Sequence, residues 1–170
     1  RSAGLKALTI EPMSSVYELP STPEDIRDLC EELGAFHAAH ASTTVPLQLC
    51  GDISHGVADA DGKVMHDNWS LFEMQIPWMR EFHFKNTDAI FNSTFGFSPA
   101  ERERGIVDLA RLKRLIDNGA GRFPADEVVG YLEIPGPKLG REYSDRHLER
   151  MLVESLEAIT AIFPGGGVPR

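Results

Sequence analysis

Four residues with metal-binding side chains lie at intervals along the chain, each near the end of a short apolar segment. Three carboxylates and one imidazole form a hard, mostly oxygen donor set, which favours Mn²⁺, with Mg²⁺, Co²⁺ and Zn²⁺ as further candidates. The residues are Glu11, Asp52, His83 and Glu133, and the segments are LKALTIE (5–11), VPLQLCG (45–51), REFHFK (80–85) and VVGYLEI (128–134).

An ordinary structural role is open to each of these side chains taken singly. An Asp or Glu at a strand end can cap the next helix or face water. Ligand-type residues at the ends of four successive segments are harder to explain in that way. The repeated placement, and no single position, favours the metal-site interpretation.

The apolar segments alternate with segments of helical periodicity, so the chain contains four successive βα units. Ser21 predicts a helix start, because Glu24 completes a capping box and Pro23 is tolerated in the first turn. Apolar residues at helical spacing predict helices near 21–36, 69–76, 107–116 and 144–162. Four βα units predict a parallel sheet, either an open doubly wound sheet or half of a barrel. In both, the carboxyl ends of the strands converge on one side, where active sites are built.

Composition narrows the classes of partner. The chain has 170 residues, of which 42% are hydrophobic and 25% charged, typical values for a globular protein. Lys and Arg total 17 against 26 Asp and Glu, for a net charge of −9. A surface of this sign repels phosphate backbones and anionic lipid, which disfavours nucleic-acid and membrane partners. Cys30 and Cys50 lack C-x-x-C spacing; a disulfide between them stays open, but a reduced cytoplasmic protein is favoured.

The motifs LTIEP, GDISHG, HFKNTD and VVGYLEIPG, in this order, resemble the xylose-isomerase-like sugar epimerases and isomerases, and most closely the ketose 3-epimerases. The resemblance covers nearly the whole chain and corresponds to strands five to eight of that barrel. It implies an α/β fold in which residues 1–163 form the second half, four βα units, of a (β/α)8 TIM barrel, followed by a tail at 164–170.

The same resemblance implies roles for individual residues. Glu11, Asp52, His83 and Glu133 become the metal ligands, and His55, three residues after Asp52, becomes a contact to substrate oxygens. The chain departs from the family pattern at one position. Several ketose 3-epimerases have an Arg six residues after the metal-binding His, where this chain has an Ala (residue 89).

These observations predict a metal-dependent epimerase or isomerase of a ketose or ketose phosphate. Glu11 and Glu133 would act as the catalytic bases that move a proton next to the carbonyl through an enediolate, with 3-epimerisation favoured. An aldose–ketose isomerase and an inosose-type dehydratase are alternatives from the same superfamily. A three-zinc endonuclease would need more His ligands and a basic face. A catalytically inactive sugar-binding barrel and a flavodoxin-like regulator are alternatives from other classes.

The loop after the last predicted strand, PGPKLGR (135–141), carries two glycines and two cations ahead of a helix. Barrels often bind a substrate phosphate at this place, so Lys138 is a predicted substrate contact. An ordinary turn with solvated cations is the alternative.

Four strands leave two open sheet edges, which natural proteins avoid. A closed barrel of this type takes about 250 residues. We therefore expect an N-terminal half of the barrel, encoded before Arg1 or supplied by a partner, and a homo-oligomeric enzyme.

Overall fold

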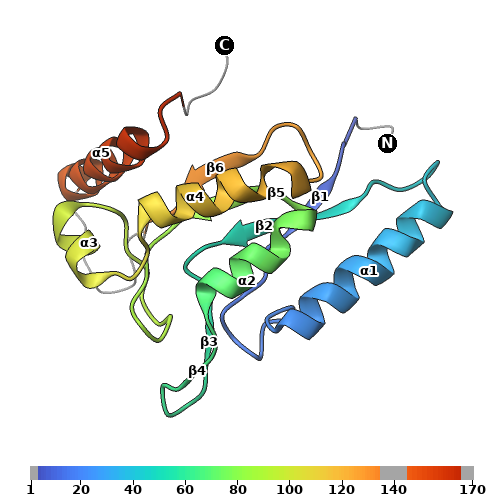
Figure 1. The fold of residues 1–170 in the computed structure, drawn as a ribbon, viewed down its shortest axis with the longest axis horizontal. Coiled ribbons are helices and arrows are strands. Elements are labelled where there is room, and N and C mark those ends of the chain that lie inside the picture. Colours follow the sequence, from blue (N-terminus) through green and yellow to red (C-terminus); the bar gives the residue numbers. More distant parts are fainter. Residues whose placement is uncertain (1–3, 135–144, 166–170) are drawn as a thin grey trace.

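The computed structural model describes residues 4–134 and 145–165. Its main sheet has four parallel strands in the order β1-β2-β5-β6 (Figure 1). Each strand overlaps one of the four predicted segments, so the predicted parallel α/β sheet is confirmed. The strands are β1 (Leu8–Ile10), β2 (Leu47–Asp52), β5 (Met79–Phe84) and β6 (Val129–Leu132).

Helices follow the strands as the periodicity predicts. The long ones are α1 (Pro23–Ala39), α2 (Asn68–Gln75), α4 (Leu109–Gly119) and α5 (Asp145–Ile162). Several short elements in the loops were not predicted. They are the hairpin of β3 (Val57–Ala58) and β4 (Val64–His66), the helix α3 (Pro99–Arg104), and the 3-10 turns η1 (Ile76–Trp78) and η2 (Ala120–Arg122).

The predicted start of α1 is wrong by one residue. Thr22, not Ser21, caps the helix: its Oγ1 accepts a hydrogen bond from Asp25 N at 3.2 Å, and its own N donates to Asp25 Oδ2 at 3.1 Å. The physical reason is Pro23, whose fixed φ suits the first helical position and thereby makes the residue before it the cap. Ser21 is buried instead.

The helices pack on one face of the sheet. On β2 and β5 this face presents Leu49, Gly51, Phe82 and Phe84, which alternate with residues of the other face. Leu49 belongs to a buried cluster with residues of α1 and α2, and the two phenylalanines belong to a larger cluster with residues of α2, α4 and α5. A doubly wound sheet has helices on both faces and a reversal of strand order. Neither feature occurs among the elements that the structure describes.

No described helix covers the opposite face of the sheet. Thr9 of β1 reaches across β2 on this side and donates a hydrogen bond to Glu81 of β5 at 2.6 Å. Tyr131 of β6 lies on the same face and is 50% exposed. The carboxyl end of this uncovered face holds the four predicted metal ligands. As for membranes, the described parts of the chain contain no helix that is both long and apolar enough to cross a bilayer.

Cys30 and Cys50 are both free and buried. Burial raises the pKa of the Cys30 thiol to about 11. Only the thiolate attacks a disulfide reagent, so Cys30 should react about 100-fold more slowly at pH 8 than an exposed thiol. We expect this slow reaction when a Cys50→Ala variant, in which Cys30 is the remaining thiol, is treated with Ellman's reagent. In guanidinium the same variant should release one thiol equivalent at once, and equally fast release from the native protein would contradict the buried position.

Candidate metal centre

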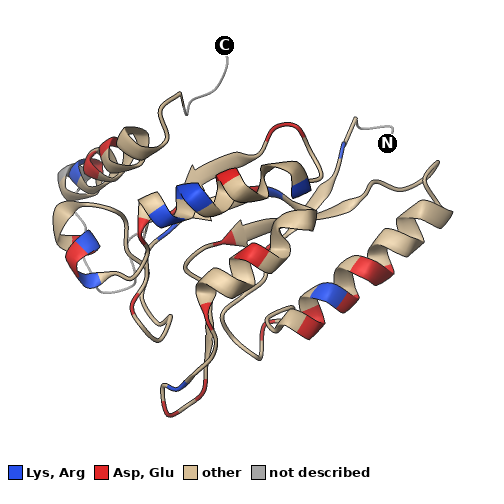
Figure 2. Ribbon diagram, viewed as in Figure 1, with Lys and Arg blue, Asp and Glu red and all other residues tan. Residues whose placement is uncertain are grey.

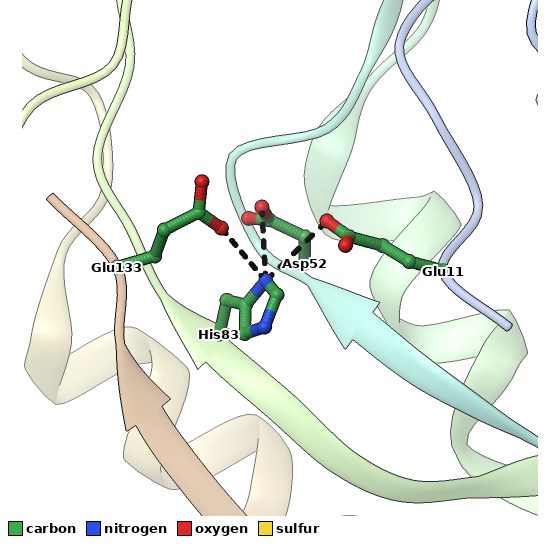
Figure 3. Close-up of side chains that lie close together, drawn as sticks. All are labelled: Glu11, Asp52, His83 and Glu133. Atoms are coloured by element: carbon green, nitrogen blue, oxygen red, sulfur yellow. Dashed lines mark ion pairs between the residues drawn. The ribbon is translucent and has the colours of Figure 1, made fainter. Parts of the chain in front are cut away.

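The four predicted ligands come together at the carboxyl end of the sheet. Glu11, Asp52, His83 and Glu133 each offer one ligand atom, and the four atoms all lie within 4.8 Å of one another (Figure 3). They come from four neighbouring parallel strands or from the residues just after them. The predicted convergence is therefore confirmed.

Local backbone structure places each ligand. Asp52 is the last residue of β2 and pairs in register with His83 of β5, so the two side chains leave the same face of the sheet. The backbone N of Glu133 donates to Phe84 O at 3.1 Å, which extends the pairing of β6 with β5 beyond the strand itself. Glu11 follows β1 directly. Parallel strands in register thus present their last residues at one level.

His83 Nδ1 lies at the centre of this group. It is 2.9 Å from Glu133 Oε2, 3.3 Å from Glu11 Oε1 and 3.7 Å from Asp52 Oδ2 (Figure 3). Although these distances are short, His83 Nδ1 and Asp52 Oδ2 are both buried atoms without a hydrogen-bond partner. Leaving a buried polar atom unpaired costs about 1–3 kcal/mol, more for a charged one. A cation between these atoms would satisfy both, so the residues present fit a metal ion.

The charges of the site are strongly coupled. Burial by itself would raise the pKa of Asp52. The contact with His83 and the nearby His55 and Lys85 together lower this pKa by more than burial raises it, so it lies well below its usual range. His83 also lowers the pKa of Glu133, against the effect of burial. In turn Asp52 and the other neighbours of the ring raise the pKa of His83. Asp52 and Glu133 are therefore ionised at neutral pH, as carboxylate ligands of a metal must be.

His55, the predicted substrate contact, lies beside the ligands. A tight turn follows β2, in which Ser54 N donates to Asp52 Oδ1 at 2.8 Å and His55 N donates to Asp52 O at 3.1 Å. This turn brings His55 Nε2 to 3.2 Å from Asp52 Oδ2. Its Nδ1 lies 2.7 Å from Pro12 O, so it must carry the proton and donate. Contact of His55 with a substrate stays a prediction.

Lys85 belongs to the site but was not predicted. Its Nζ lies 3.1 Å from Asp52 Oδ2 and 3.0 Å from Glu133 Oε1. The signal was present in the sequence, because side chains two residues apart on a strand leave the same face. His83 and Lys85 have this spacing in HFK.

Two further calls concern the surrounding loops. Lys138, the predicted phosphate contact, lies outside the described residues. Ala89, at the position where an Arg was expected from the family pattern, is an exposed residue of the loop after β5. The structure thus offers no substitute for that Arg at the same position.

Comparison with known proteins does not assign the site to a family. No protein-family model matches the chain, and no curated protein matches it either. What the geometry supports by itself is a set of three carboxylates and one imidazole that can hold a divalent cation, with two of the carboxylates partly open to solvent.

Proposed function

We propose that this chain is the second half of a (β/α)8 barrel and acts as a metal-dependent epimerase or isomerase of a ketose or ketose phosphate. The observation that carries the proposal is the convergence of Glu11, Asp52, His83 and Glu133 within 4.8 Å at the carboxyl ends of four parallel strands. In barrels, active sites are built at this end of the strands. Inversion at C3 is the favoured reaction.

The arrangement of the sheet supports the half-barrel. Its strands follow one another in sequence order, and the described helices pack on a single face, as in a barrel wall. The other face carries the exposed Tyr131 and the whole ligand group. In a closed barrel this face would line the interior and the open edges of β1 and β6 would be paired.

The reaction requires that a proton be removed from the carbon next to a carbonyl and returned to it. A bound divalent cation supplies electrostatic stabilisation of the negative charge that develops on adjacent substrate oxygens. The protein has to supply bases on both sides of the reacting carbon.

Glu11 and Glu133 have the placement that two such bases need. They approach the centre from opposite sides, with Asp52 and His83 between them (Figure 3). Their side chains are 29% and 40% exposed, whereas that of Asp52 is 0% exposed. Asp52 can therefore hold a cation but cannot reach a substrate. One glutamate would take the C3 proton from one face of the sugar, and the other would deliver a proton to the opposite face, which inverts that carbon.

An isotope experiment tests the reaction class. Incubated in D₂O with Mn²⁺ and a panel of free and phosphorylated ketoses, the protein should place deuterium at C3 of both epimers, as read by proton NMR. Deuterium at C1 instead would show that the enzyme interconverts an aldose and a ketose. Binding of a ketose without any exchange would favour the inactive sugar-binding barrel.

A further inference from the structure

Lys85 differs from the other cations of the molecule in its burial. Most of the described Lys and Arg residues lie on helices (Figure 2), and Lys85 is the one among them that is buried, with 9% of its surface exposed. Its ammonium group also lies close to three other side chains. Besides its ion pairs with Asp52 and Glu133, its Nζ lies 3.4 Å from His55 Nε2.

The two carboxylate oxygens of Glu133 have different neighbours, and Lys85 contacts one of them. Oε2 lies 2.9 Å from His83 Nδ1 and faces the centre of the ligand group, while Oε1 lies 3.0 Å from Lys85 Nζ. The ammonium group is thus a close neighbour of the metal position. On Asp52 it contacts Oδ2, the same oxygen that lies 3.7 Å from His83 Nδ1. The charge of an exposed surface lysine is screened by salt, whereas that of a buried lysine is screened much less.

This cation changes the charge that a metal ion would meet. Three carboxylates alone carry a formal charge of −3, and with one ammonium group the total is −2. A divalent cation then makes the centre neutral, whereas a trivalent cation leaves an excess positive charge in a buried site, which is costly. Removal of Lys85 would reverse this preference, because a trivalent ion would then match the three carboxylates.

We propose that Lys85 is a specificity-determining residue of the metal centre, a fixed positive charge that makes the site select divalent over trivalent cations. The inference rests on the proposed metal site, but not on the sugar reaction. It assigns Lys85 no part in proton transfer.

The test uses metals alone. Dissociation constants for Mn²⁺ and Tb³⁺ are measured by calorimetry in the wild-type chain and in Lys85→Met, which keeps the length of the side chain but removes its charge. The ratio of the Mn²⁺ constant to the Tb³⁺ constant should rise about 10- to 100-fold in this variant, because the repulsion that is lost grows with the charge of the bound ion. Lys85→Arg keeps the positive charge, and the Coulomb energy depends on charge and distance, so the ratio should stay within about threefold. Lys113→Met, at a partly exposed lysine that pairs with Asp117, serves as the matched control.

A charge series keeps the test decisive if Lys85→Met fails to fold. Glu133→Gln removes one negative charge and should lower the ratio, and the double variant with Lys85→Met restores the wild-type total and should restore the ratio. An unchanged ratio in Lys85→Met, or a double variant that does not return toward wild type, would overturn the role of Lys85. If the wild type binds no Mn²⁺ at one ion per chain, the metal site itself is wrong, and the proposed function fails with it.

Discussion

Dialysis of the protein against a chelator is expected to abolish the proposed activity, and addition of Mn²⁺ or Co²⁺ is expected to restore it. The reason is the arrangement of donor atoms: His83 Nδ1 and Asp52 Oδ2 are buried and make no hydrogen bond, and a metal ion could bind both at once, whereas Lys85 Nζ contacts only Asp52 Oδ2. A metal ion contributes several kcal/mol of charge stabilisation in such reactions, so the rate should fall by at least about 10³-fold. Elemental analysis after dialysis confirms that the metal is gone.

Variants connect this loss to the four ligands. His83→Ala should bind less than about one tenth of the wild-type Mn²⁺, since it removes the ring nitrogen that lies within 3.7 Å of all three carboxylates. His40→Ala is the matched control, because His40 is exposed at the C-terminal cap of α1 and contacts Phe36, not the ligand group. Full activity of a preparation shown to be free of metal would refute the metal-dependent mechanism.

The candidate site was predictable because its chemistry is concentrated at strand ends. Glu11, Asp52, His83 and Glu133 could be found from residue type and position alone, since parallel strands bring their carboxyl ends to one side. The role of Lys85 could not be predicted from residue type and position. Its role depends on its depth in the protein and on contacts with Asp52 and Glu133, which lie far away in the sequence.

The long loops were the least predictable parts of the fold, because tertiary contacts hold them. In the turn of the β3–β4 hairpin, Asp59 Oδ1 accepts hydrogen bonds from the backbone N of Asp61 and of Lys63. Its two strands have three and two residues, too few for a visible alternation.

Helix α3 did leave a sequence signal. Ser98 and Glu101 form a capping box around Pro99, the same pattern that α1 carries. The helix has only six residues, however, so it shows no apolar periodicity. Buried Glu101 also accepts a hydrogen bond from Gly96 N at 3.0 Å, and the next residue, Phe97 N, donates to Ser155 on α5 at 2.8 Å. These contacts fix the segment, and the second one depends on a residue distant in sequence.

Replacement of either glutamate by glutamine is expected to lower kcat for epimerisation by roughly 10²–10⁴-fold, the contribution of one general base. Glutamine keeps the size of the side chain and one carbonyl oxygen but cannot accept the C3 proton. Because Glu11 and Glu133 are also proposed metal ligands, the variants must be assayed at saturating Mn²⁺ with the bound metal measured. Glu81→Gln is the matched control: Glu81 lies on the same sheet face and accepts from Thr9, outside the ligand group, so its change should stay within about threefold.

The two glutamine variants should differ from one another in hydrogen exchange. In D₂O each variant keeps one base, which can still remove and return a proton on its own face of the sugar. Glu11→Gln and Glu133→Gln should therefore each exchange the C3 hydrogen of one epimer and not of the other, with the two variants acting on opposite epimers. Exchange in both epimers by one variant, with none by the other, would point to a single base that serves both faces. That result would contradict the proposed placement of Glu11 and Glu133 on opposite sides of the reacting carbon, while leaving the proposed metal centre intact.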